Sequence, residues 1–349
     1  MAACATAAIA SACAYSSPVV AGSTVPAAQR TASVDETDVR RLLSALADDS
    51  IEGRKVGTRG EKRAAGVIAR EMQAIGLVAS GDSGYFQRVP LRGITGRRGQ
   101  PAFALAGSWT ELDTVPAERR GLGLNVIGIL SGSDPALRDD IVLIGAHYDH
   151  VGIGAPVNGD SIFNGADDDA SGVVTMLEIA RAMSRGPAPR RTVIFMASTG
   201  EEAGLLGTSW YIRNPVRPVS RMVANMDIEM VGRPDSLAGG PGRAWLTGYE
   251  RSTMGDMLKA ANIPIVPDPR PDQRFFERSD NIAFARMGIP AHTLSSFGMH
   301  TDHHAPSDEV DRIDFSHMTS VISAAITAAR FLADGPAPVW KEGGRPPAR

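Results

Sequence analysis

The sequence predicts an α/β fold with a mostly parallel central sheet covered by helices on both faces. Short runs of strand type alternate along the chain with segments of helical spacing. These runs are mostly apolar, as expected for parallel strands that are buried on both faces. Clusters of polar residues follow the ends of several runs, which is where ligands bind in open α/β sheets.

Two helices open the predicted domain. Residues 36–49 carry apolar side chains at helical spacing. The segment 58–77 has Thr58 and Glu61 in the spacing of a capping box and Gly76 as a stop signal. Both segments therefore predict amphipathic helices.

The remaining elements alternate between the two types. We expect strands at 124–130, 141–146, 191–198, 221–228 and 290–296. We expect helices at 172–183, 201–213, 251–263, 279–289 and 314–335, the last ended by Gly335. Residues 94–121 are rich in Pro and Gly and predict an irregular segment. This unbroken alternation favours one domain over the two that a chain of this length suggests.

The sequence divides into residues 1–35, a leader of signal-peptide type, a domain at 36–335 and a disordered tail at 336–349. The leader is small, weakly apolar and rich in Ala and Ser, so we expect an exported protein, periplasmic or extracellular. Lipid attachment at Cys13 is the alternative. Both cysteines, Cys4 and Cys13, lie in the leader, so a metal site in the domain must use His and carboxylate ligands.

The composition also excludes two classes of partner. The net charge is −3, and no segment gathers the Lys and Arg density that binding to nucleic-acid phosphates requires. No run approaches the about 20 apolar residues needed to span a bilayer. We therefore expect small or peptide-like ligands, no nucleic acid and no membrane span.

Five polar clusters stand at strand ends or helix starts: "HYDH" at 147–150, "DDD" at 167–169, "TGEEAG" at 199–204, Asp227, and "MHTDHHAPSD" at 299–308. Each alone has an ordinary interpretation as a helix cap, a dipole-stabilising acid or a loop histidine. Together they concentrate histidines and acids without neighbouring Lys or Arg, which indicates a bound cation. Imidazole and carboxylate without thiolate favour zinc or a related ion. The number of carboxylates suggests two ions that share one carboxylate.

The motifs "AHYDH", "GDSIFNGADDDASG", "TGEEAGLLGT", "ANMDIEMVG" and "DHHAPSD" resemble, in order and spacing, those of the co-catalytic di-zinc aminopeptidases. These include bacterial leucyl aminopeptidases and the aminopeptidase Y type, and their family also holds glutaminyl cyclases and the transferrin receptor ectodomain. The resemblance covers residues 45–330 and lacks the protease-associated insert of larger members. It implies a zinc-exopeptidase fold and two Zn²⁺ ions.

Carried onto this sequence, the resemblance implies five metal ligands: His147 and Asp227 on one zinc, Glu202 and His304 on the other, and Asp168 bridging both. His304 is preferred to His303 because "HAPSD" keeps the His-x-Pro-x-Asp spacing of the family.

The resemblance also implies supporting roles. It makes Asp149 the partner that orients His147 and makes the Asp168–Asp169 peptide cis. Asp167 and Asp169 would then support the loop or cap the following helix.

Glu201 stands beside a ligand, and the resemblance makes it the general base that takes a proton from the attacking water and passes it to the leaving amine. Ser279 and Asp280 fall in a segment that borders the cleft of the family and are assigned to substrate binding. A helix-start interpretation of this pair is the alternative.

The function implied is a metallopeptidase that removes N-terminal residues from peptides with a free amino terminus. Carboxypeptidase or dipeptidase action on the same zinc pair is the main alternative. Glutaminyl cyclisation is disfavoured by the complete ligand set and by both Glu201 and Glu202 being present. A non-catalytic binding module is disfavoured by the same ligands.

Overall fold

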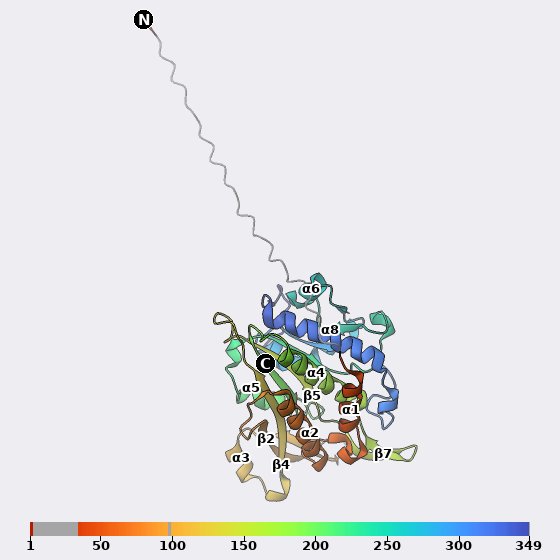
Figure 1. Ribbon diagram of the computed structural model, residues 1–349. Helices are drawn as coiled ribbons and strands as arrows, with labels where there is room; N and C mark the ends of the chain where they lie inside the picture. The colour runs from red at the N-terminus through yellow and green to blue at the C-terminus, as the bar shows by residue number, and fades with distance from the viewer. Residues whose placement is uncertain (3–33, 97–98, 349) are drawn as a thin grey trace. The chain divides into compact units, whose positions relative to one another are not determined.

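The computed structural model describes residues 1–2, 34–96 and 99–348 (Figure 1). The chain divides into the units Met1–Arg30 and Thr31–Arg349, and every element given below belongs to the second unit. The predicted leader, residues 1–35, lies almost entirely outside the described residues. Within the described part of the chain, no helix has the length and apolarity to cross a membrane.

A large mixed sheet forms the centre of the second unit, with the strand order β11-β10-β12-β9-β5-β8-β4-β2-β3 and with β1 beside β4. Its strands are β1 (Val78–Ala79), β2 (Phe86–Thr95), β3 (Pro101–Leu105), β4 (Arg120–Leu130), β5 (Ile141–His147), β8 (Thr192–Ser198), β9 (Met222–Ile228), β10 (Ala244–Leu246), β11 (Ile265–Pro267) and β12 (Ala291–Ser295). The central strands β12, β9, β5 and β8 are mutually parallel. A separate hairpin pairs β6 (Gly152–Val157) with β7 (Asp160–Phe163). The predicted α/β class with a mostly parallel centre is confirmed.

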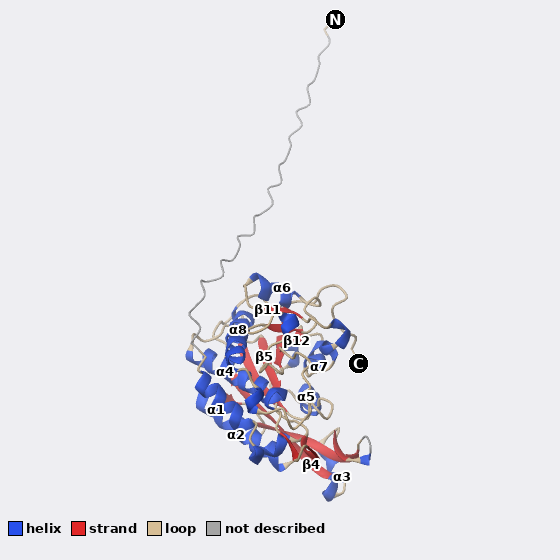
Figure 2. Ribbon diagram, turned by 90° about the vertical axis from the view of Figure 1, so that its right-hand side faces the viewer, coloured by secondary structure: helices blue, strands red, loops and turns tan. Residues whose placement is uncertain are grey.

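Helices cover both faces of this sheet (Figure 2). They are α1 (Glu36–Leu46), α2 (Arg59–Ile75), α3 (Trp109–Thr114), α4 (Gly172–Arg185), α5 (Leu206–Arg213), α6 (Thr253–Ala260), α7 (Asn281–Arg286) and α8 (Phe315–Asp334). Helices α1, α2, α4 and α8 pack on one face and share its largest apolar core. Helices α5 and α7 lie on the other face, where Tyr211 packs edge-on against Phe284. Strand β5 is therefore buried along its whole length.

Helix α2 begins and ends where the sequence predicts. The Thr58 side chain accepts a hydrogen bond from the backbone N–H of Glu61, and this satisfies one of the free donors of the first turn. At the other end Gly76 adopts a φ of 87°, which favours glycine because it has no Cβ. The cap residues thus define this helix as the sequence indicated.

Two segments differ from expectation. Residues 94–121, predicted to be irregular, contain β3 and α3, because β3 pairs antiparallel with the unforeseen strand β2. The tail from 336 to 348, predicted to be disordered, is ordered by Trp340. That residue forms a β-bridge with Ser252 and donates its indole N–H to the carbonyl of Gly288 at 2.9 Å. One half-buried aromatic side chain orders a segment whose polar composition suggested disorder.

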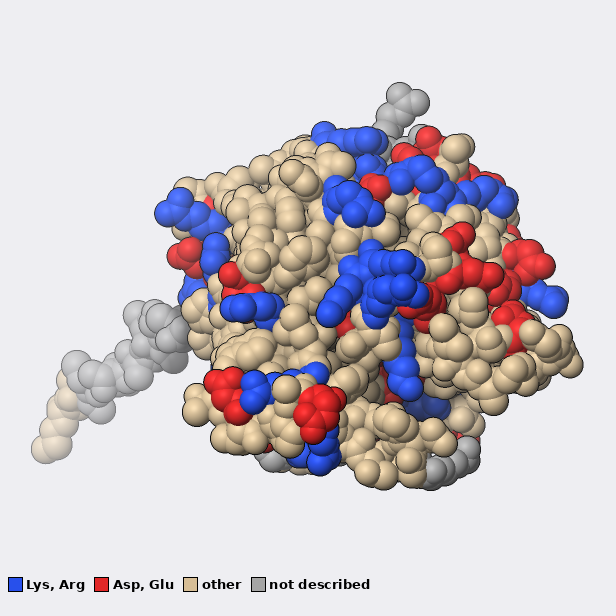
Figure 3. All heavy atoms as spheres, turned by 90° about the horizontal axis from the view of Figure 1, so that it is seen from below, with Lys and Arg blue, Asp and Glu red and all other residues tan. Residues whose placement is uncertain are grey.

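Charged side chains of both signs lie among one another on the face seen from below (Figure 3). Surface ion pairs such as Arg88–Asp82 and Arg92–Glu111, at 3.3 and 3.6 Å, bring opposite charges together. Exposed pairs of this kind contribute about 0–1 kcal/mol each. They affect the surface potential more than the stability of the fold.

Candidate metal centre

Three neighbouring strands carry ligand-type side chains at or just beyond their carboxyl ends. His147 is the last residue of β5, Glu201 and Glu202 follow β8, and Glu229 follows β9 directly. Because β8, β5 and β9 are parallel neighbours, these ends meet at one edge of the sheet. Asp168 reaches the same edge from the turn that leads into α4.

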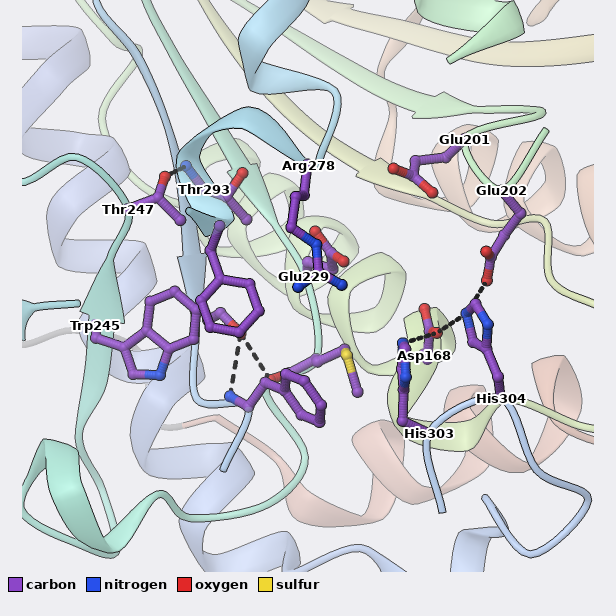
Figure 4. A pocket seen from close by; sticks show the side chains of 14 residues that line it. Asp168, Glu201, Glu202, Glu229, Trp245, Thr247, Arg278, Thr293, His303 and His304 are labelled. Atoms are coloured by element: carbon purple, nitrogen blue, oxygen red, sulfur yellow. Dashed lines mark hydrogen bonds and ion pairs between the residues drawn. The ribbon is translucent and has the colours of Figure 1, made fainter. Parts of the chain in front are cut away.

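The first group of converging side chains is His150, Asp168, Glu202 and His304, whose ligand atoms all lie within 4.8 Å of one another (Figure 4). His304 Nε2 lies 2.8 Å from Glu202 Oε1 and 3.1 Å from Asp168 Oδ2. His150 Nδ1 lies 3.0 Å from the same Glu202 oxygen. The structure thus brings the predicted residues Asp168, Glu202 and His304 together and adds His150.

His303 occupies a secondary position. Its Nε2 lies 3.5 Å from Asp168 Oδ2, whereas His304 contacts both Asp168 and Glu202. Its ring stacks on that of His304 with centroids 4.0 Å apart and also packs against Phe297. The geometry therefore agrees with the choice of His304 as the ligand.

The second group is His147, Asp168 and Glu229. His147 Nε2 lies 3.3 Å from Asp168 Oδ1, while the other carboxylate oxygen, Oδ2, faces His304. The carboxylate of Asp168 therefore presents one oxygen to each group, which is the arrangement of a bridging ligand.

Glu229 takes the place that the sequence analysis gave to Asp227. Asp227 lies inside β9, paired with Gly145 and Thr293, and its Oδ1 accepts a hydrogen bond from Asn225 at 3.1 Å. Glu229 directly follows the strand, with its backbone N–H still bonded to the carbonyl of Leu294 in β12 at 3.0 Å, and its side chain lines the pocket at the edge of the sheet. The structure corrects the prediction here: both acids belong to "MDIE", and only the second is grouped with His147 and Asp168.

Asp149 supports the site differently from the prediction. Its backbone carbonyl, and not its carboxylate, lies at hydrogen-bond distance from His147 Nδ1, at 3.2 Å. The carboxylate oxygen Oδ1 lies 3.9 Å from that nitrogen and accepts instead from the backbone N–H of Glu201 at 3.0 Å. Asp149 therefore positions both His147 and the loop that carries Glu201.

The flanking acids of the triplet have the supporting roles expected of them. Asp169 Oδ1 accepts from the backbone N–H groups of Gly172, at the start of α4, and of Met230, each at 3.0 Å. Asp167 Oδ1 accepts from Gly232 N at 2.7 Å. The peptide between Asp168 and Asp169 is cis, as the resemblance implies. Asp168 therefore belongs to the ligand groups, and the two acids beside it stabilise the surrounding backbone.

The electrostatics of the site suit a cation. Desolvation and Asp168 act to raise the pKa of Glu202, but hydrogen bonds from His150 and His304 lower it to about 2. Contacts with Asp168 and Glu202 raise the pKa of His304 to about 10. The carboxylates are thus stabilised by positive charge. When no metal is bound, protonated imidazole supplies that charge. A divalent ion would provide the same charge, and the N and O donor set fits the zinc class.

Two further residues, which the sequence analysis did not single out, stabilise the backbone around the site through hydrogen bonds. Arg54 is buried and donates to five backbone carbonyls, those of Leu46, Tyr148, Asn164, Gly165 and Asp168. The side chain of Asp308, in "HAPSD", accepts from the backbone N–H groups of Asp167 and Asp168 at 3.0–3.1 Å. Asp308 lies in one of the quoted motifs and Arg54 in none, and the partners of both residues are distant in sequence and could not be read from it.

Residues 125–329 match the model of peptidase family M28. The chain belongs to this family. Among curated relatives, a probable leucine aminopeptidase 2 of Aspergillus fumigatus is 30% identical over 172 residues, which are 48% of this chain and 32% of that protein. Leucine aminopeptidase 2 of Trichophyton rubrum is 26% identical over 248 residues, which are 68% of this chain and 47% of that protein. The chain thus spans about a third to a half of the length of these two relatives.

Solved structures share the fold over nearly their whole length. A zinc aminopeptidase from Bacillus subtilis has a TM-score of 0.63 at 18% identity and covers 88% of this chain and 97% of that one. An aminopeptidase from Aneurinibacillus sp. strain AM-1 has a TM-score of 0.62, also at 18% identity, and covers 87% of this chain and 95% of that one. At this identity the likeness establishes the fold.

A pocket of this M28 domain opens beside the two groups (Figure 4). One wall carries acids of the site, among them Glu201, and the other is formed by Met230, Trp245, Phe275 and Phe297. Ser279 and Asp280, predicted to bind substrate, are buried and do not line it; their neighbour Arg278 does.

Ser279 and Asp280 instead form hydrogen bonds with residues at or next to the site. Asp280 accepts a hydrogen bond from Ser198 at 2.5 Å. It is also the N-cap residue of α7, in agreement with the helix-start alternative, although its side chain makes no capping hydrogen bond. Burial raises the pKa of Glu229 to about 6, and a hydrogen bond from Ser279 acts against this shift. Ser279 is thus one of the groups, after the charge of His147, that favour the ionised form of Glu229.

Proposed function

We propose that the chain is an aminopeptidase with two zinc ions in a catalytic domain of residues 36–335. One ion is held by His147, Asp168 and Glu229, and the other by Asp168, Glu202 and His304, with His150 within reach of the second. The observation that carries this proposal is that the two oxygens of Asp168 face different ligand groups. It is supported by the family and by the names of the relatives and structural neighbours, which are aminopeptidases.

The residues around the pocket have separate roles in the proposed reaction. Zinc at this place would polarise the scissile carbonyl and lower the pKa of water. Glu201 lines the pocket but belongs to neither ligand group, and desolvation raises its pKa well above the ordinary range. It is the proton acceptor for the attacking water and the donor to the leaving amine. Asp149 fixes the backbone of Glu201 and so sets its position.

Variants of Glu229 and Asp227 test directly which of these two acids is a metal ligand. We expect wild-type protein to hold close to two zinc ions and Glu229→Gln to hold about one, because the amide removes an anionic ligand. Asp227→Asn should retain both, since its carboxylate faces Asn225 and the β-ladder. Elemental analysis of the folded variants measures this. Loss of zinc from Asp227→Asn alone would restore the original ligand assignment.

The direction of peptide cleavage separates the aminopeptidase from its rivals. We expect leucyl p-nitroanilide to be hydrolysed and its N-acetylated form to be left intact, because an aminopeptidase requires a free α-amino group. Release of p-nitroaniline measures both reactions. Equal hydrolysis of the two substrates would contradict the proposed specificity, and removal of C-terminal residues from N-blocked peptides would establish a carboxypeptidase instead.

A further inference from the structure

Arg278 is the basic residue that lines the pocket beside the metal centre. In Figure 4 its side chain projects toward the middle of the pocket, between Trp245 and the pair Asp168 and His304. The pocket is therefore divided into an acidic wall, an apolar wall and a guanidinium between them.

The backbone of Arg278 is held while its side chain is exposed. Phe275 and Phe276 are buried before it, and Ser279 and Asp280 are buried after it. The guanidinium lies over the Phe275 ring, with Cζ 5.0 Å from the ring centroid, a contact that keeps the cation on the aromatic wall. The charge thus lies at the aromatic wall of the pocket on a backbone held by its buried neighbours.

The charge of Arg278 has no carboxylate at ion-pair distance among the described residues. Two other arginines of the same region do have one: Arg270 pairs with Asp235, and Arg274 pairs with Glu277. With two divalent ions bound as proposed above, the four positive charges of the metals exceed the three negative charges of the ligating carboxylates. Arg278 is then not needed as their counter-charge and is available to a substrate.

The pocket wall beside Arg278 is largely apolar and includes Met230, Trp245, Phe275 and Phe297. The indole N–H of Trp245 is itself buried, so it is not a donor that a substrate in the pocket can reach. The guanidinium of Arg278 is therefore the group that recognises an anion on this side of the pocket. A carboxylate fits it, because guanidinium binds a carboxylate with two parallel hydrogen bonds.

We propose that Arg278 determines specificity by binding a carboxylate of the substrate, an inference that rests on the proposed aminopeptidase function. The carboxylate has two possible sources, the side chain of an N-terminal Glu or Asp and the free C-terminus of a dipeptide. Both place an anion within a residue or two of the scissile bond. The apolar wall contacts the aliphatic part of the same substrate.

Two matched pairs of substrates distinguish these sources: Glu- against Gln-p-nitroanilide, and Leu-Ala against Leu-Ala-amide. We expect wild-type enzyme to favour the charged member of one pair by about tenfold or more in kcat/KM, the scale of a charge-assisted bidentate contact. In Arg278→Met this ratio should fall toward one, and in Arg278→Lys it should be intermediate. Arg274→Met, which changes an exposed arginine paired outside the pocket, should keep the wild-type ratio.

The outcomes separate this inference from the function on which it rests. A wild-type enzyme that hydrolyses leucyl p-nitroanilide but shows no preference within either pair would overturn the role of Arg278. So would an Arg278→Met variant that keeps the wild-type ratio, or one that loses zinc and slows charged and uncharged substrates equally. Absence of any hydrolysis of leucyl p-nitroanilide by zinc-loaded wild type would instead refute the aminopeptidase itself.

Discussion

Replacing Glu201 with Gln is expected to lower kcat by about 10²–10⁴-fold, the usual contribution of general acid–base catalysis. The amide keeps the size of the side chain but cannot accept the proton of the attacking water. Glu201 belongs to neither ligand group, so zinc content should be unchanged. The fold should also persist, because Asp149 holds the backbone N–H of residue 201 and not its side chain. Steady-state kinetics with elemental analysis and circular dichroism measure all three quantities.

Glu202→Gln is the matched control. It is the same chemical change one residue further on, but Glu202 contacts His150 and His304 in the first ligand group. We therefore expect this variant to lose zinc as well as turnover, and added zinc should restore part of its activity. An active Glu201→Gln enzyme would contradict the assignment of the base. Loss of zinc from that variant would make Glu201 a ligand.

The parallel centre of the sheet could be predicted because its strands are short, apolar and separated by helical segments. The antiparallel edge could not, since β2 reads "FQRVPLRGIT", in which Arg, Pro and Gly interrupt any alternation. Its pairing with β4 and β3 is a long-range contact that decides the structure over local preference. A long-range contact also explains why the tail is ordered. The hydrogen bond from the Trp340 indole to the carbonyl of Gly288 holds the residues next to Trp340 in place.

Much of the site could be predicted because its histidines and carboxylates occur in short motifs at the ends of strands. The structure differs from the prediction in the position of one ligand along β9. Asp227 and Glu229 are two residues apart and so fall on the same face of an extended chain, and the sequence does not show which of them lies at the edge of the sheet. The sequence did not indicate Arg278 but its neighbours Ser279 and Asp280, because the wall of a pocket is assembled from several elements and no single motif contains it.

Arg54→Met is expected to lower the free energy of unfolding by about 3–5 kcal/mol, because it leaves buried carbonyls without a donor and nearby acids without a cation. Burial lowers the pKa of Arg54, whereas the charges of Asp168 and Asp308 raise it. The side chain ties the Tyr148 and Asp168 carbonyls to one guanidinium, with N–O distances of 2.7 and 3.4 Å. Met fills a similar volume but makes none of these bonds.

Urea denaturation of wild type, Arg54→Met and Arg59→Met measures this effect. Arg59 lies five residues further on, is exposed and pairs with Glu52, so its replacement should change stability by no more than about 0.5 kcal/mol. Each protein should be unfolded both with zinc and after chelation, because zinc adds its own binding energy to the folded state. If Arg54 acts through its carbonyl contacts, its deficit remains after chelation, when zinc no longer contributes. A deficit that disappears on chelation would mean that Arg54 acts only by strengthening metal binding.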